Sequence, residues 1–341
     1  MDTKKRKRVA QAATLKTKTT SRSKSSSTAC MMASIQLVSM NVAGCQPSAA
    51  APKNWTLENV TQAVRTEILK TNPDVVALQE CPYATWAAET FEASGYSVLG
   101  PAKESHSGFV ALLFRTAMLE QAQGVTIRRV NLPFAVPAVM VRVIQEPPSR
   151  NGGDQNENNN TVIDVDKQPQ TICVASCHLA PFQEGTADRQ RQVQAMIQAS
   201  MGMPVIIAGD LNMRVSEDKI MEGSKLGLKD AWKMAGAHVS EKYTWNTRDN
   251  RRGKGGGFNC FYGADTRQYV TRYDRIYVHT GTSKRKPDED DLFDDDKDGS
   301  VLKLSVPSFR LIANQPIAPS TTYFLSDHFG IAAKLKLDWK K

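Results

Sequence analysis

Residues 204–214 have the sequence PVIIAGDLNMR, an apolar run followed by two polar side chains at alternate positions. Four apolar residues directly precede Gly209 and three of them are β-branched, which is typical of a strand buried on both faces. If extended geometry continues past Gly209, Asp210 and Asn212 point the same way at the end of a core strand. Rigid scaffolds present catalytic groups at such places, for instance a carboxylate that accepts a proton. A turn is the alternative, because Asp and Asn beside Gly are common turn residues.

Other predicted strands also deliver polar side chains to one end. The alternating segment over 35–41 ends in Asn41, and the buried strand over 73–80 ends in Glu80. A carboxylate directly after an apolar strand is either a solvated strand end or a ligand. Strands over 171–179, over 272–278 and from 326 onward carry the remaining members of the set, which are His178, Asp274, Asp327 and His328. Each member alone has a structural explanation, but the whole set is hard to assemble by accident.

The elements between these strands alternate in type. Thr56 is expected to cap a helix with apolar residues at helical spacing, and a second helix is expected to lead from His178 to the Asp210 strand. Residues 228–234 are expected to be helical, and residues 109–114 and 138–144 are expected to be strands. This order indicates a mixed α/β fold.

The chain has 341 residues, of which 40% are hydrophobic, so it can bury one large core or two modest ones. No apolar run approaches the roughly 18 residues of a membrane span, and the N-terminus is basic rather than a signal peptide. The six cysteines include no CxxC pair and no histidine at zinc-finger spacing. Reduced thiols in an intracellular protein are therefore expected.

The net charge of +9 is unevenly distributed. Residues 1–33 carry nine Lys/Arg against one acid, a net of +8, so the remainder of the chain is only +1. That remainder includes the run over 288–298, whose eight acids and one lysine give −7. The rest of the body is therefore basic, which indicates a polyanionic partner, although most of the basicity lies in the N-terminal arm.

Several segments have too few apolar residues to fold. Residues 1–33 are expected to be a disordered arm, and residues 146–169 and 283–300 are expected to be disordered insertions in a single domain over 34–341. In the arm, Lys4–Arg8 is a basic cluster of the nuclear-import kind, with a solvated charge run as the alternative. The segment after Tyr243 mixes cations with aromatic rings, which suits single-stranded nucleic acid or is an ordinary exposed loop.

The order of the polar motifs resembles that of the endonuclease/exonuclease/phosphatase superfamily. The motifs are MN at 40–41, LQE at 78–80, HL at 178–179, GDLN at 209–212, YDRI at 273–276 and SDH at 326–328. They span roughly residues 34–338 and are jointly specific. The resemblance implies a four-layer α/β sandwich, in which two mixed sheets pack face to face with helices outside.

Within that superfamily, the C-terminal half is most similar to the 5′-tyrosyl-DNA phosphodiesterases. The matching pieces are DAW at 230–232, YTWNT at 243–247, RYDRI at 272–276 and SDHFG at 326–330. The chain departs from the relatives at Ala43, where they usually have Asp, and at Pro181 and Gln183, where the tyrosyl-DNA enzymes have Ser and Arg. The tyrosine of their substrate groove falls near Gly108 or Phe109. These departures bear on the substrate more than on the reaction type.

The resemblance implies a metal-assisted attack by water on a phosphodiester. Glu80 would hold Mg²⁺, with Mn²⁺ as a possible substitute, and Asp327 would support the metal site from behind. Asp210 would position and deprotonate the attacking water, while Asn212 and Asn41 would orient water and phosphate.

Charge that gathers on the phosphoryl oxygens must also be met. His178 and His328 would donate to the non-bridging oxygens, and Asp274 would hold one imidazole in its donating form. The residues expected to bind the substrate are Trp245, Tyr273 and Arg214.

These assignments predict a Mg²⁺-dependent phosphodiesterase that hydrolyses the 5′-phosphotyrosyl bond between a DNA end and a trapped protein tyrosine, leaving a 5′-phosphate. A tyrosyl leaving group has a pKa of about 10 and could depart without a strong acid. The predicted partner is DNA with a 5′-protein adduct at a single-stranded end, with no membrane, and the predicted location is nuclear. The alternatives are an abasic endonuclease, an RNA deadenylase, a phosphoinositide phosphatase, or a non-catalytic nucleic-acid-binding relative.

Overall fold

The computed structural model describes residues 34–47, 53–103, 108–120, 124–131, 137–145, 170–246, 270–281, 302–317 and 324–339. The basic arm, the two polar excursions and the cation-rich and aromatic-rich stretch over 247–269 lie outside these residues. The expectations for those segments therefore stay predictions. Among the described helices, none is long and apolar enough to cross a membrane.

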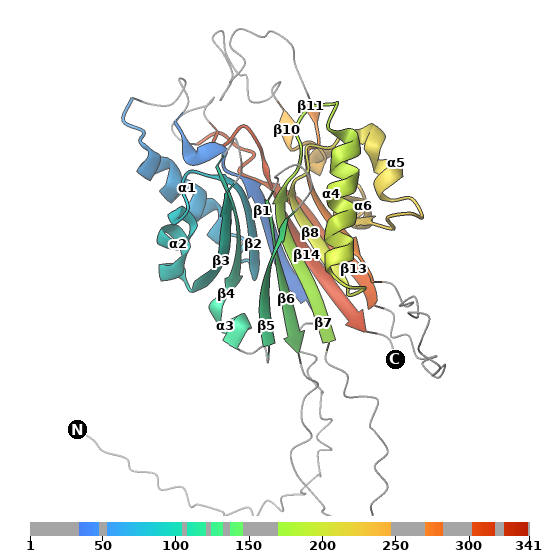
Figure 1. The fold of residues 1–341 in the computed structure, drawn as a ribbon. Coiled ribbons are helices and arrows are strands. Elements are labelled where there is room, and N and C mark those ends of the chain that lie inside the picture. The colour runs from blue at the N-terminus through green and yellow to red at the C-terminus, as the bar shows by residue number, and fades with distance from the viewer. Residues whose placement is uncertain are drawn as a thin grey trace, which may run out of the picture.

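Two six-stranded mixed sheets form the centre of the fold (Figure 1). The first has the strand order β13-β14-β1-β2-β4-β3, with β1 (Ser34–Asn41), β2 (Val75–Cys81), β3 (Tyr96–Lys103), β4 (Phe109–Arg115), β13 (Leu302–Ile312) and β14 (Gly330–Trp339). The second has the order β5-β6-β7-β8-β12-β9, with β5 (Gly124–Asn131), β6 (Pro137–Gln145), β7 (Gln170–His178), β8 (Val205–Asp210), β9 (Lys229–Asp230) and β12 (Asp274–His279). A short ribbon pairs β10 (Trp245–Asn246) with β11 (Val270–Thr271).

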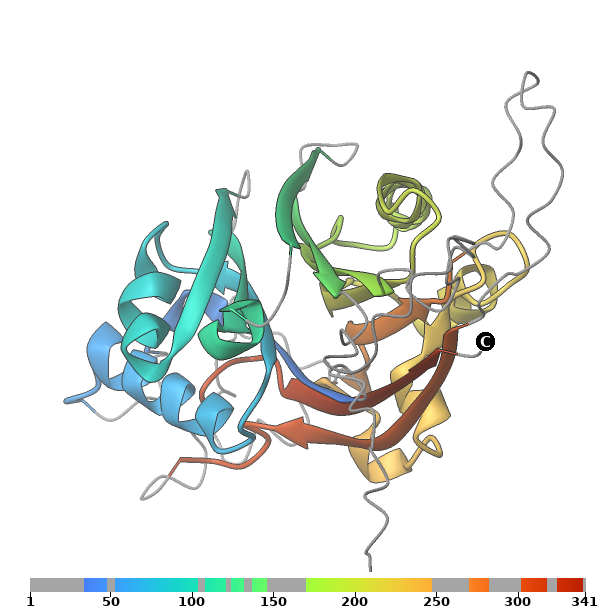
Figure 2. The same ribbon diagram turned by 90° about the horizontal axis from the view of Figure 1, so that it is seen from below.

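The sheets pack face to face, and helices cover their outer faces (Figure 2). Helices α1 (Leu57–Leu69) and α2 (Trp86–Phe91) pack on the first sheet, and α4 (Thr186–Ala199) packs on the second. The remaining helices are short: α3 (Thr116–Glu120), α5 (Asp218–Met221) and α6 (Ala231–Met234). The predicted four-layer α/β sandwich is confirmed.

Helix α1 begins where the sequence predicts. The Thr56 hydroxyl accepts the backbone N–H of Asn59, and the Asn59 side chain accepts the backbone N–H of Thr56, which together form a capping box. Val60, Val64 and Ile68 share one buried face of the helix, as their spacing predicts.

The faces that the two sheets turn toward each other change from apolar to polar along the strands. On this face β1 presents Ile35, Leu37, Ser39 and Asn41, and β7 presents Ile172, Val174, Ser176 and His178. Gln79 Nε2 on β2 donates to Ser176 Oγ on β7 at 3.2 Å, which links the two sheets just below the polar end. Strand periodicity therefore delivers polar side chains to one end of an otherwise apolar interior.

Parallel pairing brings the strand ends together. The strands β1 and β2 run parallel, as do β7 and β8, so in each sheet two carboxyl ends meet at one edge. In the second sheet His178 is the register partner of Asp210, and Asp274 at the start of β12 is the partner of Asp210 on its other side. This end of the sandwich is uppermost in Figure 1, where the β10–β11 ribbon also lies.

One sequence expectation is wrong in detail. Residues 228–234 are not one helix, because Lys229 and Asp230 pair with β12 as strand β9 and the Asp230 carboxylate caps the short helix α6. The extended geometry considered past Gly209 does hold as far as Asp210, which is the last residue of β8.

Candidate active site

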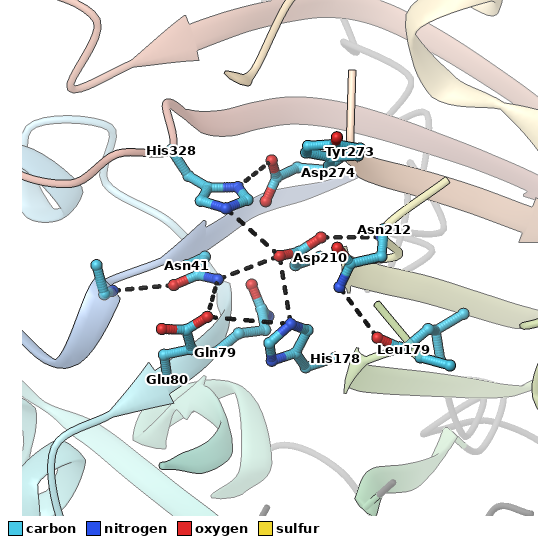
Figure 3. A network of polar contacts seen from close by, with 12 residues as sticks. Asn41, Gln79, Glu80, His178, Leu179, Asp210, Asn212, Tyr273, Asp274 and His328 are labelled. Atoms are coloured by element: carbon cyan, nitrogen blue, oxygen red, sulfur yellow. Dashed lines mark hydrogen bonds and ion pairs between the residues drawn. The ribbon is translucent and has the colours of Figure 1, made fainter. Parts of the chain in front are cut away.

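Asp210 is the centre of a cluster of hydrogen-bond donors. Its Oδ2 atom lies 3.2 Å from Asn41 Nδ2, 3.4 Å from His178 Nε2 and 3.5 Å from His328 Nε2 (Figure 3). Burial alone would raise the pKa of Asp210, but the two histidines and the hydrogen bonds from Asn212 and Asn41 hold it below its usual value. Asp210 is therefore ionised at neutral pH, as a proton acceptor must be.

Gly209 allows the two strands that carry His178 and Asp210 to approach each other. A Cβ atom on Gly209 would lie 1.9 Å from the carbonyl oxygen of Cys177, its register partner on β7. Any side chain at this position would push β8 away from β7. The contact between His178 and Asp210 thus depends on glycine at the preceding position.

Asn212 reaches the site through a turn rather than through extended geometry. Its φ is +51°, and its backbone N–H donates to Asp210 Oδ1 at 2.9 Å, which makes an Asx-turn directly after β8. Extended geometry therefore ends before Asn212, and the turn given above as the alternative is the one that the structure shows. The turn still places Asn212 beside Asp210, and Asn212 Nδ2 donates to the Leu179 carbonyl at 3.0 Å (Figure 3).

Asn41 joins two carboxylates. Its Nδ2 atom donates to Glu80 Oε1 at 2.9 Å and to Asp210 Oδ2 at 3.2 Å, while its Oδ1 accepts the N–H of Ala43 at 2.9 Å. The two amide hydrogens of Asn41 thus hold the carboxylates of Glu80 and Asp210 beside each other. The predicted role of Asn41 in orienting water and phosphate stays a prediction.

Glu80 has a strained backbone. Its φ of +53° lies in the left-handed region, which bulky residues rarely adopt, and the pairing of β2 with β4 is irregular between Leu78 and Cys81. Gly108 packs directly against this irregularity, since a Cβ there would lie 2.7 Å from the Cys81 carbonyl oxygen. The surrounding backbone thus fixes the conformation in which Glu80 lies beside Asn41.

The donor set at Glu80 fits a hard divalent cation. Ligand atoms of Glu80, His178 and Asp210 lie within 4.8 Å of one another. Burial raises the pKa of Glu80, and the nearby negative charge of Asp210 adds to this, although His178 and Asn41 act in the opposite direction. A cation between the carboxylates would relieve that repulsion. Mg²⁺ prefers oxygen ligands and keeps several waters, so Glu80 together with a substrate phosphate could hold it.

A second group of carboxylates is already neutralised. Three ion pairs engage it, namely Asp218 Oδ1 with Arg275 Nη2 at 3.2 Å, Asp230 Oδ2 with Arg272 Nη2 at 2.6 Å, and Glu222 Oε1 with Lys233 Nζ at 2.6 Å. This group lies at α5, β9 and the start of β12 and works as a structural network. Of these two groups, the one at Glu80 suits a metal better.

His328 and Asp274 form a buried pair. His328 Nδ1 lies 2.9 Å from Asp274 Oδ2, so the opposite ring nitrogen points at Asp210 (Figure 3). Burial alone would lower the pKa of His328, but the carboxylates of Asp274 and Asp210 raise it well above its ordinary value. This geometry is the one expected for an imidazole held in its donating form.

Two hydroxyl residues that sequence reasoning missed position this pair. Ser326 Oγ donates to the Asn41 carbonyl at 2.7 Å and accepts the N–H of His328 at 3.2 Å. Thr244 Oγ1 accepts the backbone N–H groups of Tyr273 and Asp274, each at 3.1 Å. Both residues belong to motifs quoted above, SDH at 326–328 and YTWNT at 243–247, but membership of a motif does not by itself reveal a hydrogen-bond partner.

The predicted substrate-binding residues lie beside the His328–Asp274 pair. The Trp245 ring packs edge-on against His328 with centroids 4.8 Å apart, and it lies 5.9 Å from the Tyr273 ring. The Arg214 guanidinium lies 5.7 Å from the Tyr273 centroid. The structure therefore brings all three together at the site, and Trp245 also supports the position of His328.

Asp327 is expected to support the metal site from behind. It is absent from the groups of potential metal ligands in the described residues, and the Ser326 hydroxyl contacts its Oδ1 at 3.4 Å. Burial, and to a smaller extent the charges of Glu80 and Asp210, raise the pKa of Asp327 to about 7. Asp327 is thus an electrostatic neighbour of Glu80, and its support of a metal stays a prediction.

Comparisons with known proteins agree with this geometry. The sequence profile of the Endonuclease/Exonuclease/phosphatase family matches residues 38–328. Curated relatives include tyrosyl-DNA phosphodiesterase 2 of Mus musculus, 25% identical over 65% of this chain and 52% of the relative, and that of Gallus gallus, 24% identical over 52% of this chain and 43% of the relative. The chain thus spans about half the length of the curated relatives it matches.

Solved structures show the same fold. The structure of D. rerio TDP2 complexed with single strand DNA product has a TM-score of 0.60 at 17% identity, covering 89% of this chain and 99% of that one. The human Nocturnin catalytic domain with bound sulfate anion has a TM-score of 0.54 at 17% identity, covering 89% and 95%. With the profile matched from β1 to His328 and the polar end assembled as described, the chain belongs to the Endonuclease/Exonuclease/phosphatase family.

Proposed function

We propose that this protein is a Mg²⁺-dependent phosphodiesterase that hydrolyses the 5′-phosphotyrosyl bond between a DNA end and a protein tyrosine. One observation carries the proposal. The buried Asp210 carboxylate is contacted by two imidazoles and an amide, and Asn41 holds the Glu80 carboxylate beside it. A proton acceptor, imidazole and amide groups and a candidate metal ligand thus lie in one place.

Hydrolysis would proceed by attack of water on phosphorus. Asp210 takes one proton from the water as its oxygen bonds to phosphorus, and the bond from phosphorus to the tyrosyl oxygen breaks. The phenolate leaves with the bonding electron pair, and the products are a free tyrosine side chain and a DNA 5′-phosphate. Because phenol has a pKa of about 10, this departure needs no strong acid.

The remaining residues hold the reacting groups. His178 and His328 each place Nε2 within 3.5 Å of Asp210 Oδ2, so both are available to donate to a phosphoryl oxygen bound beside that carboxylate. Asp274 keeps His328 protonated for this role. A Mg²⁺ ion bound at Glu80 would polarise the phosphoryl oxygens and offset the negative charge that develops on them.

Two further observations bear on the substrate, the first on a tyrosyl–DNA end and the second on a single-stranded nucleic acid. The curated relatives cited above are named tyrosyl-DNA phosphodiesterase 2, and a structural neighbour holds a single-stranded DNA product. Trp245 and Tyr273 provide rings next to the site, and aromatic rings stack on the bases of single strands.

A substrate panel tests the proposal. The protein is incubated with Mg²⁺ and a 5′-phosphotyrosyl oligonucleotide, an abasic duplex, a poly(A) RNA or a phosphoinositide, and the products are separated. We expect release of tyrosine and a 5′-phosphorylated strand from the first substrate at a rate well above turnover of the others. Faster cleavage of any other member of the panel would contradict the proposed substrate.

We also propose that the protein acts in the nucleus, since residues 4–8 are five consecutive cations in an arm that carries a net charge of +8. Fusion of residues 1–33 to a cytoplasmic reporter should move the reporter into the nucleus. A fusion with Lys4–Arg8 changed to alanine is the matched control. An unchanged distribution of the first fusion would contradict import by this arm.

A further inference from the structure

Phe182 is an exposed aromatic residue on the segment that follows His178. The residue is 55% exposed, so its ring gains little from the core. Its φ of +64° lies in the left-handed region, which a bulky side chain rarely adopts. Neither burial nor backbone preference therefore explains an aromatic residue here. A strained, exposed residue near an active site is a candidate for contact with substrate.

The backbone of this segment is held rigidly. The fully buried Arg189 donates from Nη1 to the carbonyl oxygens of Ala180 and Phe182, each at 2.7 Å. Glu217 pairs with the same guanidinium at 2.7 and 3.0 Å. Gly185 is required for this packing, since a Cβ there would lie 2.5 Å from the Pro181 carbonyl. The Phe182 ring is thus presented from a fixed backbone, which limits the entropy lost when it binds a ligand.

The backbone of Phe182 is also linked to the site through Arg214. Arg214 Nη1 donates to the Phe182 carbonyl at 2.8 Å and to the Asn212 carbonyl at 2.9 Å, and its guanidinium lies 5.7 Å from the Tyr273 ring. Tyr273 in turn lies 5.9 Å from Trp245. We call Trp245, Tyr273, Arg214 and Phe182 the aromatic rim. In Figure 3 Tyr273, a member of this rim, lies on the side of the site away from Glu80, as do Asn212 and Leu179.

We propose that Phe182 stacks on a base of the single-stranded nucleic acid whose 5′ end lies in the active site, and so extends the aromatic rim beyond Arg214. This inference rests on the proposed function only in taking a polynucleotide as the substrate. Proteins bind single strands with aromatic rings and cations side by side in one groove, because every base has a face on which a ring can stack and a cation meets the charge of the backbone. The rigid backbone fixes where along the strand that stacking takes place.

Binding measurements test this proposal without requiring the hydrolytic reaction. Affinity for a fluorescent 5′-phosphorylated single-stranded oligonucleotide is measured by anisotropy in EDTA. Phe182→Ala should weaken binding by about 5- to 150-fold, the range of one base–ring stack. Phe182→Trp keeps a ring and should bind within about twofold of the parent protein, since stacking on a base tolerates the change of ring.

Met201 offers a matched control. It is 59% exposed and has a φ of +54°, so it shares the exposure and backbone conformation of Phe182 but lies just past the end of α4, where the aromatic rim does not reach. Met201→Ala should leave oligonucleotide affinity unchanged. Phe182→Gly relieves the left-handed strain and should raise or preserve the melting temperature while weakening binding, which separates recognition from folding.

Abasic substitutions locate the contact. Oligonucleotides that carry one abasic residue at each of the first four positions in turn are compared on the parent protein and on Phe182→Ala. We expect one position at which removal of the base abolishes the difference in affinity between the parent protein and Phe182→Ala. Unchanged affinity of Phe182→Ala, or an equal loss on every abasic oligonucleotide, would overturn the proposal. If the protein shows this position-dependent binding but does not cleave the 5′-phosphotyrosyl oligonucleotide, only the proposed reaction is overturned.

Discussion

His178 and Asp210 are register partners on the parallel strands β7 and β8, and His178 Nε2 lies 3.4 Å from Asp210 Oδ2. The pair exists because two core strands of different sequence end at the same level. Each strand is apolar on its inner face until its last residue or two, so the polar groups emerge only where the interior ends. The candidate site is thus a consequence of strand length and register.

The approach of these two strands gives a first prediction. Gly209→Ala would place a Cβ 1.9 Å from the Cys177 carbonyl, so β7 and β8 must separate. We expect a loss of free energy of unfolding larger than the roughly 1 kcal/mol typical of Gly→Ala at a positive φ, together with loss of turnover. Gly95→Ala is the control, because Gly95 has a φ of +82° but open space around it. Equal melting temperatures for the two variants would contradict the close approach.

The second prediction concerns the metal. Glu80→Gln removes the proposed ligand while keeping the side-chain shape, so Mg²⁺ should no longer bind measurably in calorimetry and turnover should fall by at least about 100-fold. The stability of the metal-free protein should not fall, because burial disfavours the charged form of Glu80 and raises its pKa, and Gln carries no charge. Glu222→Gln, in the neutralised acidic group, should leave Mg²⁺ binding unchanged. Full wild-type turnover in excess EDTA would contradict any metal requirement.

The third prediction follows from the His328–Asp274 pair. Since the pKa of His328 is raised well above its ordinary value of about 6.5, its donating form persists at neutral pH and is lost only as the pH rises through the raised pKa. Activity should therefore fall on the alkaline side. The free energy of unfolding that protonated His328 contributes depends on pH in the same way. It is fully present below about pH 6.5 and is lost as the pH rises through the raised pKa.

Asp274→Asn tests this assignment. The substitution removes the negative charge that faces Nδ1 at 2.9 Å, so the pKa of His328 should drop and the alkaline limb of kcat/KM should move to lower pH. The pH profile of both proteins is recorded with the same substrate at constant ionic strength. An alkaline limb at the same pH in parent and variant would show that His328 is not the group that titrates.

The fourth prediction separates the rings of the aromatic rim. Because Trp245 packs 4.8 Å from His328, Trp245→Ala should reduce cleavage of a minimal phosphotyrosine analogue as well as that of a tyrosyl oligonucleotide. Tyr273, at 6.3 Å from His328, should matter more for the oligonucleotide, with KM raised about tenfold and little effect on the analogue. Equal losses on both substrates for Tyr273→Ala would mean that its ring only supports the fold.

Much of this site could be predicted from the sequence because strand periodicity carries the information. Asn41, Glu80, His178 and Asp210 each end an apolar run, and each does lie at the same end of the sandwich. Asp274 was placed correctly by its strand, since it begins β12 as the register partner of Asp210.

The rest could not be predicted, because it depends on tertiary contacts. Nothing near Arg189 indicates that its side chain is fully buried and fixes the Phe182 segment, and nothing near Gly108 shows that it packs against the Glu80 backbone. The helix expected over 228–234 fails for a similar reason, since pairing of β9 with β12 overrides local helix preference. Backbone strain at Glu80 and Phe182 is likewise visible only in the fold.

The central claim is that Asp210 accepts the proton from the attacking water, and Asp210→Asn tests it most directly. Asn can still accept the N–H of Asn212 and preserve the Asx-turn, so the fold and substrate affinity should remain close to those of the parent. It cannot take up the proton, and general-base catalysis typically contributes about 10²–10⁴-fold. We therefore expect single-turnover cleavage of a 5′-phosphotyrosyl oligonucleotide to slow by at least about 100-fold with Kd nearly unchanged. Retention of more than about a tenth of the parent rate would contradict the general-base role of Asp210.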